Sequence, residues 1–179
     1  GRHAVQEKNL MTMPVQHADL NNGVYATPDN FIDAVKRRFH IRTFAFDFAA
    51  SPENTKGEWF WTKKHDSLSM PDWHEMVPRG EWGWLNPPYA DIAPWVKKCA
   101  EMQRAGGRIM LLAPASTGAR WFEEFVWPHA HVFFLIGRLA FMPHKPKWLY
   151  PKDCILAVYS PAKPHGIPVM PVLWDWRQP

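Results

Sequence analysis

The chain has 179 residues, of which 46% are hydrophobic and 21% are charged, and its formal net charge is +4. This balance predicts one globular domain and excludes a disordered or fibrous chain. The sequence contains no run of about 18 or more apolar residues and no charged-then-apolar leader, so we expect no membrane span and a cytoplasmic location.

Cysteine and histidine usage argues against a metal centre. Cys99 and Cys154 are far apart in apolar stretches, so we expect them to be reduced core residues. The nine histidines lack zinc-ligand spacing. The positive charge is compatible with a polyanionic partner. Eleven tryptophans and eleven phenylalanines are unusual. Most must be core residues, but bases stack well on aromatic faces, at about 1–3 kcal/mol per base. The composition thus favours nucleic acid without requiring it.

The first part of the chain predicts an arm, a helix and a strand. We expect residues 1–24 to be an N-terminal arm and residues 25–179 to be a single domain. Thr27 can cap a helix and Pro28 suits its first position. The apolar stripe of this helix consists of Phe31, Ile32, Val35 and Phe39. A strand over 42–46 follows and ends at Asp47.

The rest of the chain alternates strands and helices. Residues 51–80 are polar and irregular with a possible short strand at 59–61, and a strand over 82–85 follows. Helices are predicted at 91–105, before Gly106 and Gly107, and at 119–127. The remaining predicted strands cover 108–112, 131–136, 155–159 and 169–174. The alternation predicts a mostly parallel, three-layer α/β sheet. The later strands have no obvious helix between them, so we expect them to be antiparallel.

The most informative feature is the turn Asn86-Pro-Pro-Tyr89, directly after a buried strand. Pro87 and Pro88 fix the backbone in an extended path and make the turn stiff. The carboxyl end of a strand is where open α/β sheets place their ligand crevices. The Asn86 amide, the Pro87 carbonyl and the Tyr89 ring suit a planar ring with an exocyclic amine, such as adenine. The alternative is a strand-to-helix turn with a packed aromatic residue.

Two acidic positions are further candidates for a ligand loop. Asp47 is followed by Phe48, Ala49 and Ala50, and small residues there let a cofactor approach the backbone. No G-x-G-x-x-G loop is present, which argues against a pyrophosphate-containing dinucleotide. Asp66 could accept a hydrogen bond from the amine of an adenine in a cofactor. The alternatives are a loop cap at Asp47 and a solvated turn at Asp66.

Basic residues near the end of the strand over 131–136 are candidates for nucleic-acid contacts. Arg138 could bind a phosphate with two hydrogen bonds, or it could pair with an internal carboxylate. Lys145 and Lys147 flank Pro146 in a loop that also contains Trp148, and this mixture suits a nucleic-acid backbone. A solvated loop explains the same residues.

In order and spacing, five motifs of this chain resemble the bacteriophage-type DNA N6-adenine methyltransferase (Dam) family, over roughly residues 24–160. They are Thr27-Pro28, Asp47-Phe-Ala-Ala50, Asp66-Ser-Leu68, Asn86-Pro-Pro-Tyr89 and Gly137-Arg-Leu-Ala-Phe141. The resemblance implies a Rossmann-like fold that uses S-adenosylmethionine and methylates the N6 of adenine in double-stranded DNA, with GATC as a first sequence to test. It also implies a bacterial host cell as the location.

The resemblance also implies roles for individual residues. Asn86, Pro87, Pro88 and Tyr89 match the catalytic loop, and Asn86 also borders the cofactor. Asp47, Phe48, Ala49 and Ala50 match the segment that holds the methionine part of the cofactor. Thr27, Pro28 and Asp66 match positions that line the cofactor pocket. Phe48 departs from the family, in which proline often follows the aspartate.

Other functions fit parts of the same pattern. An RNA base or a protein glutamine amide suits the Asn-Pro-Pro-Tyr turn as well as a DNA base does. A non-catalytic module that stacks bases on its tryptophans would explain the charge and the aromatic content. It gives no reason for Asp47 and Asn86 to follow buried strands.

Overall fold

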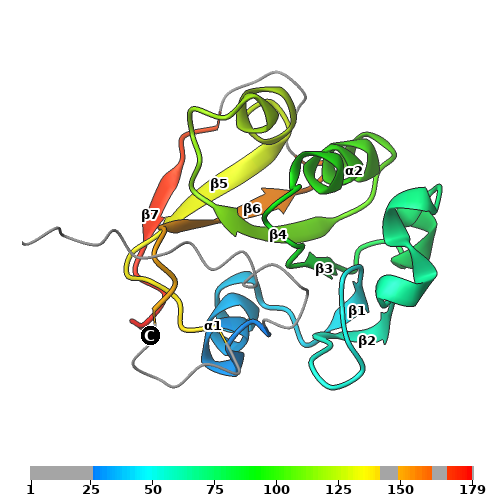
Figure 1. The fold of residues 1–179 in the computed structure, drawn as a ribbon, viewed down its shortest axis with the longest axis horizontal. Coiled ribbons are helices and arrows are strands. Elements are labelled where there is room, and N and C mark those ends of the chain that lie inside the picture. Colours follow the sequence, from blue (N-terminus) through cyan, green and yellow to red (C-terminus); the bar gives the residue numbers. More distant parts are fainter. Residues whose placement is uncertain (1–25, 142–148, 163–168, 179) are drawn as a thin grey trace, which may run out of the picture.

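The computed structural model describes residues 26–141, 149–162 and 169–178, and these residues form one seven-stranded mixed sheet with helices on both faces (Figure 1). The predicted arm at 1–24 and the two candidate lysines Lys145 and Lys147 lie outside the described residues. The strands are β1 (Phe44–Asp47), β2 (Gly57–Phe60), β3 (Gly83–Leu85), β4 (Ile109–Pro114), β5 (Ala130–Leu135), β6 (Cys154–Tyr159) and β7 (Val172–Trp174).

The sheet confirms the predicted α/β class and its mostly parallel pairing. Its strand order is β2-β1-β3-β4-β6-β5-β7, and β2, β1, β3 and β4 pair in parallel. Strand β6 is antiparallel to both of its neighbours, as predicted for the late strands. The prediction is wrong for β7, which pairs in parallel with β5. Strand β5 lies between β6 and β7, so these two consecutive strands are not neighbours in the sheet.

Helix α1 (Asp29–Phe39) buries one apolar face against the sheet. Pro28, and not Thr27, is its N-cap, and no side-chain capping bond is present. The start of the helix is thus shifted by one residue from the prediction, because the Thr27 hydroxyl accepts a hydrogen bond from Asn86 instead of capping the helix. The helix ends at His40, which adopts the left-handed conformation with φ of 53°.

The other helices cover the opposite face of the sheet (Figure 1). Helix α2 (Ala93–Arg104) has Pro94 in its first turn, where the missing N–H costs nothing. The α-helix predicted over 119–127 is replaced by a short π-helix (Phe122–Val126), in which the N–H of Trp127 donates to the Phe122 carbonyl. Pro128 follows immediately, and because it has no N–H to donate it ends the segment.

Two apolar clusters hold the layers together, one on each face of the sheet. The first packs α2 and the π-helix on residues such as Leu111 and Ile155, and the second packs α1 on residues such as Trp84 and Leu156. Cys99 and Cys154 are buried free thiols, as the sequence predicted. Burial raises the pKa of both thiols, that of Cys154 to about 12.

The crossover between β1 and β2 is unusually short. Parallel strands need a connection of about a dozen or more residues, usually with a helix, yet residues 48–56 link these two strands through turns alone. The chain therefore returns close to β1. A Cβ on Gly57 would lie 2.5 Å from the Asp47 nitrogen and 2.7 Å from the Phe46 carbonyl carbon. Only glycine fits this approach of two backbones.

We predict that Gly57→Ala lowers the free energy of unfolding by about 1–3 kcal/mol or more, because backbone atoms cannot yield to the added methyl group. Gly118→Ala is the matched control, since a Cβ at Gly118 meets nothing within 4 Å, and it should change stability by less than about 0.5 kcal/mol. Urea unfolding of the three proteins measures the difference. Equal midpoints would show that the approach at Gly57 is not tight.

Candidate active site

The candidate site lies at the carboxyl edge of the sheet, between two neighbouring strands. Strand β1 ends at Asp47, Asn86 follows β3, and the two strands pair in parallel with Asp47 opposite Trp84. From β1 the chain first adds β2 on one side and later β3 on the other. Such a reversal of strand order is the point where open α/β sheets bind ligands.

The half-buried side chain of Asn86 is hydrogen-bonded at both ends of its amide. Its Nδ2 donates to the Thr27 Oγ1 at 3.1 Å, and its Oδ1 accepts from the Tyr89 hydroxyl at 2.9 Å. Pro87 is buried behind it, and the two prolines hold the backbone of the turn. The structure thus brings together three predicted site residues: Thr27, Asn86 and Tyr89.

Tyr89 lies among aromatic side chains rather than alone. Its ring contacts Phe141 and Tyr150, with centroids 6.2 and 5.6 Å apart and near-perpendicular planes. Burial raises its pKa well above the ordinary value. The sequence did not predict these two contacts of Tyr89. Phe141 was noted only as part of a motif and Tyr150 not at all, because nothing in the local sequence links either residue to the Asn-Pro-Pro-Tyr turn.

The Asp47 carboxylate is buried and accepts hydrogen bonds from the β1–β2 crossover that follows it. Its Oδ1 accepts from the Ala49 amide at 3.2 Å and its Oδ2 from the Lys56 amide at 2.9 Å. Burial raises the pKa of Asp47 from 3.8 to about 6, although both amides and the charge of Lys56 act in the opposite direction. Lys56 in turn pairs with Asp29 of α1 at 2.6 Å. Asp47 therefore shapes its own loop, and Lys56 is a supporting residue that sequence reasoning missed.

The side chain of Phe48 points into the core. It is fully buried and stacks on Trp73, with centroids 4.3 Å apart and planes 12° apart. Its side chain is therefore a packing element, and only its backbone is left to meet a ligand. Ala49 and Ala50, which follow it, are half-buried.

Asp66 lies beside this loop through its neighbour Ser67. The buried Ser67 hydroxyl donates to the Phe48 carbonyl at 2.6 Å, and the Ser67 carbonyl accepts from the Trp73 indole at 2.9 Å. Asp66 itself is exposed, with φ of 49°. The fold thus brings the Asp66 segment next to the loop after Asp47.

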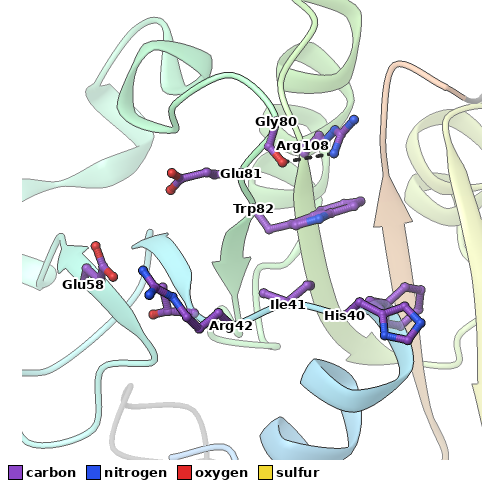
Figure 2. Close-up of a pocket in the computed structure, with 10 residues that line it drawn as sticks. His40, Ile41, Arg42, Glu58, Gly80, Glu81, Trp82 and Arg108 are labelled. Carbon is purple, nitrogen blue, oxygen red and sulfur yellow. Dashed lines mark hydrogen bonds between the residues drawn. The ribbon is translucent and has the colours of Figure 1, made fainter.

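A cavity of about 400 Å³ lies at the opposite edge of the sheet, near the amino ends of β1, β3 and β4 (Figure 2). Arg42, Trp82 and Arg108 are among its lining residues, and Arg108 donates to the Gly80 carbonyl. None of the predicted site residues lines it.

A sequence model of the family described as DNA N-6-adenine-methyltransferase (Dam) matches residues 14–154, most of the chain. This chain belongs to the Dam family. The resemblance seen in its motifs is thereby confirmed.

Two phage relatives of the chain are named as members of the same class. It is 28% identical over 144 residues to the DNA N-6-adenine-methyltransferase of Escherichia phage T1, an alignment that covers 69% of this chain but only 56% of that protein. It is 24% identical over 148 residues to the protein of the same name from Haemophilus phage HP1, covering 80% and 82% of the two chains. The chain thus spans a little over half the length of the T1 relative. No solved structure matches it.

The matched region of the Dam family includes Thr27, Asp47, Asn86 and Arg138. The mixed seven-stranded sheet is consistent with a methyltransferase-like fold. Among the described residues, no helix is long and apolar enough to span a membrane, and no group of three or more histidine, cysteine or acidic side chains could hold a metal ion.

Arg138 is exposed and lies near the exposed Asp153, with 3.7 Å between its Nε and Oδ1. This pair is at the surface, and not internal as one reading of the sequence allowed. Exposed ion pairs are worth at most about 1 kcal/mol, so Arg138 can exchange Asp153 for another anion at little cost.

We predict that Asp47 makes stability depend on pH. Its pKa in the folded chain, about 6, lies above the ordinary value of 3.8, so the folded chain holds this proton more tightly. The resulting stabilisation is complete below about pH 4 and is lost as the pH rises through 6. Relative to Asp47→Asn, the parent should lose about 3 kcal/mol of its free energy of unfolding over this range. Urea unfolding at several pH values measures this, and a constant difference would contradict the raised pKa.

Proposed function

We propose that the chain transfers a methyl group from S-adenosylmethionine to the exocyclic N6 of adenine in double-stranded DNA. The observation that carries this proposal is the position of the Asn86 amide, beside the end of β1 at the reversal of strand order. Membership of the Dam family and the names of both relatives support the same activity.

The loop after β1 has features that suit the cofactor. The backbone of residues 48–50 is pinned by the Asp47 carboxylate and by the Ser67 hydroxyl, and the small side chains of Ala49 and Ala50 leave it accessible. Since Asp47 has a pKa of about 6, it is mostly ionised at neutral pH and its charge favours a cation such as a sulfonium. Pro28 and Asp66 lie on the segments around this loop and belong to the proposed cofactor site, whereas the Thr27 hydroxyl bonds the Asn86 turn.

The chemistry of the transfer follows from the groups on the Asn86 turn. The lone pair of the adenine amine is delocalised into the ring, which makes N6 a poor nucleophile. In our proposal the Asn86 oxygen and the Pro87 carbonyl each accept one N6–H bond and hold the nitrogen towards tetrahedral geometry. Its lone pair forms the new N–C bond while the C–S bond breaks, and N6 then loses a proton to water. Bound S-adenosylmethionine supplies the methyl group on a good leaving group. Alignment and acceptors placed where positive charge develops lower the barrier.

An adenine inside a duplex cannot reach this turn, so the mechanism requires the base to be flipped out at a cost of a few kcal/mol. Stacking on one face of Tyr89 is of the right size to offset much of that cost. Arg138 and the loop with Lys145 and Lys147 are the proposed contacts to the DNA backbone. GATC is the first sequence to test.

The proposed acceptor can be separated from the alternatives by direct competition. DNA, RNA and protein acceptors are offered side by side with a tritiated methyl donor, and we expect label only in adenine of DNA. Label in RNA or in a glutamine side chain would favour those alternatives. Saturable quenching of tryptophan fluorescence by S-adenosylmethionine would argue against a module that only binds nucleic acid.

We predict that Asn86→Ala nearly abolishes methyl transfer, with a loss of at least about 100-fold, because the acceptor next to N6 is removed. Binding of S-adenosylmethionine, followed by tryptophan fluorescence, should survive. Asn30→Ala is the control, since Asn30 is an exposed residue of α1. Equal rates for the Asn86 variant and the parent would refute the mechanism.

A further inference from the structure

The Thr27 hydroxyl is a buried group that serves the Asn86 turn instead of its own helix. Thr27 precedes Pro28, the N-cap of α1, and is only 3% exposed, but it makes no capping bond to that helix. Its Oγ1 accepts a hydrogen bond from the Asn86 Nδ2, at a sequence separation of 59 residues. A buried hydroxyl costs free energy unless it is hydrogen-bonded, so this contact stabilises one arrangement of the turn.

The Tyr89 hydroxyl acts on the other end of the same amide. It donates to the Asn86 Oδ1 at 2.9 Å, while the ring is held by Phe141 and Tyr150. An amide oxygen can accept two hydrogen bonds, so the Tyr89 contact does not by itself prevent that oxygen from accepting a bond from a substrate amine. The two hydroxyls therefore bracket the amide, one at the nitrogen and one at the oxygen.

The position of Thr27 is itself fixed by the fold. The start of α1 is tied to the β1–β2 crossover by the ion pair of Asp29 and Lys56. The first turn of the helix also buries Phe31 and Ile32 against the sheet. A hydroxyl held in this way defines a direction for the Asn86 side chain before any ligand binds.

We propose that Thr27 and the Tyr89 hydroxyl are positioning residues that hold the Asn86 carboxamide with its oxygen presented to the target amine. This inference rests on the proposed function. An amide rotated by half a turn would present an N–H to the amine, and two donors would then face each other. Thr27 thus acts on the rate of transfer through Asn86 rather than on the affinity for the methyl donor.

The test uses three substitutions that keep the shape of the site. Thr27→Val and Tyr89→Phe remove one hydroxyl each, and Thr27→Ser keeps the hydroxyl. We expect Thr27→Val and Tyr89→Phe to lower kcat by about tenfold each, which corresponds to about 1.4 kcal/mol in the barrier. Thr27→Ser should stay within about threefold of the parent. The affinity for S-adenosylmethionine, from tryptophan fluorescence, should change by less than about twofold in all three.

Matched controls separate this role from a general loss of stability. Thr43→Val alters a threonine at the amino end of β1, and Tyr159→Phe removes a hydroxyl that donates to the Phe125 carbonyl on the far side of the sheet. Both controls should keep the parent's kcat. Thermal unfolding of every variant accompanies the kinetics.

Four results would overturn the inference. Weaker binding of S-adenosylmethionine with unchanged kcat in Thr27→Val would make Thr27 a cofactor contact. Equal losses in Thr27→Val and Thr27→Ser would make it a packing residue. A normal kcat in both hydroxyl-free variants, with an active parent, would remove the positioning role and leave the proposed function intact. A parent that methylates no DNA would instead remove both.

Discussion

The parallel pairing of β1 with β3 is the constraint on which the candidate site depends. It sets the Asp47 loop and the Asn86 turn side by side at one edge of the sheet, although they are far apart in the sequence. Parallel strands end at the same edge, and the reversal of strand order leaves space between the connections that depart from them. The buried strands thus determine where a ligand can meet both segments.

The short β1–β2 crossover braces this arrangement with hydrogen bonds and an ion pair. Burying the Asp47 carboxylate is unfavourable, as its raised pKa shows, but two backbone amides and Lys56 offset part of that cost. The ion pair of Lys56 with Asp29 extends the same bracing to the start of α1. One loop is thus bonded to both β1 and the start of α1.

Much of the candidate site follows from local signals in the sequence. The end of β1 at Asp47 and the stiff turn at Pro87 and Pro88 follow from strand patterns and from proline geometry. Tertiary contacts decided the rest. Phe48 sits in the core because Trp73 offers a stacking partner, and the capping role predicted for Thr27 gives way to a bond with Asn86. The parallel direction of β7 depends on the placement of β6, which no short pattern encodes.

In the proposed mechanism Tyr89 serves two demands that fall on different parts of its side chain. Its hydroxyl is engaged by Asn86, and its ring meets Phe141 and Tyr150 at steep angles. Contacts with two rings at steep angles restrict the rotation of the Tyr89 ring. A base that stacks on Tyr89 in the proposed mechanism would therefore meet a ring whose orientation is already fixed. In the proposed mechanism, the contacts that hold the hydroxyl on the Asn86 amide would also lower the entropy cost of capturing a flipped base.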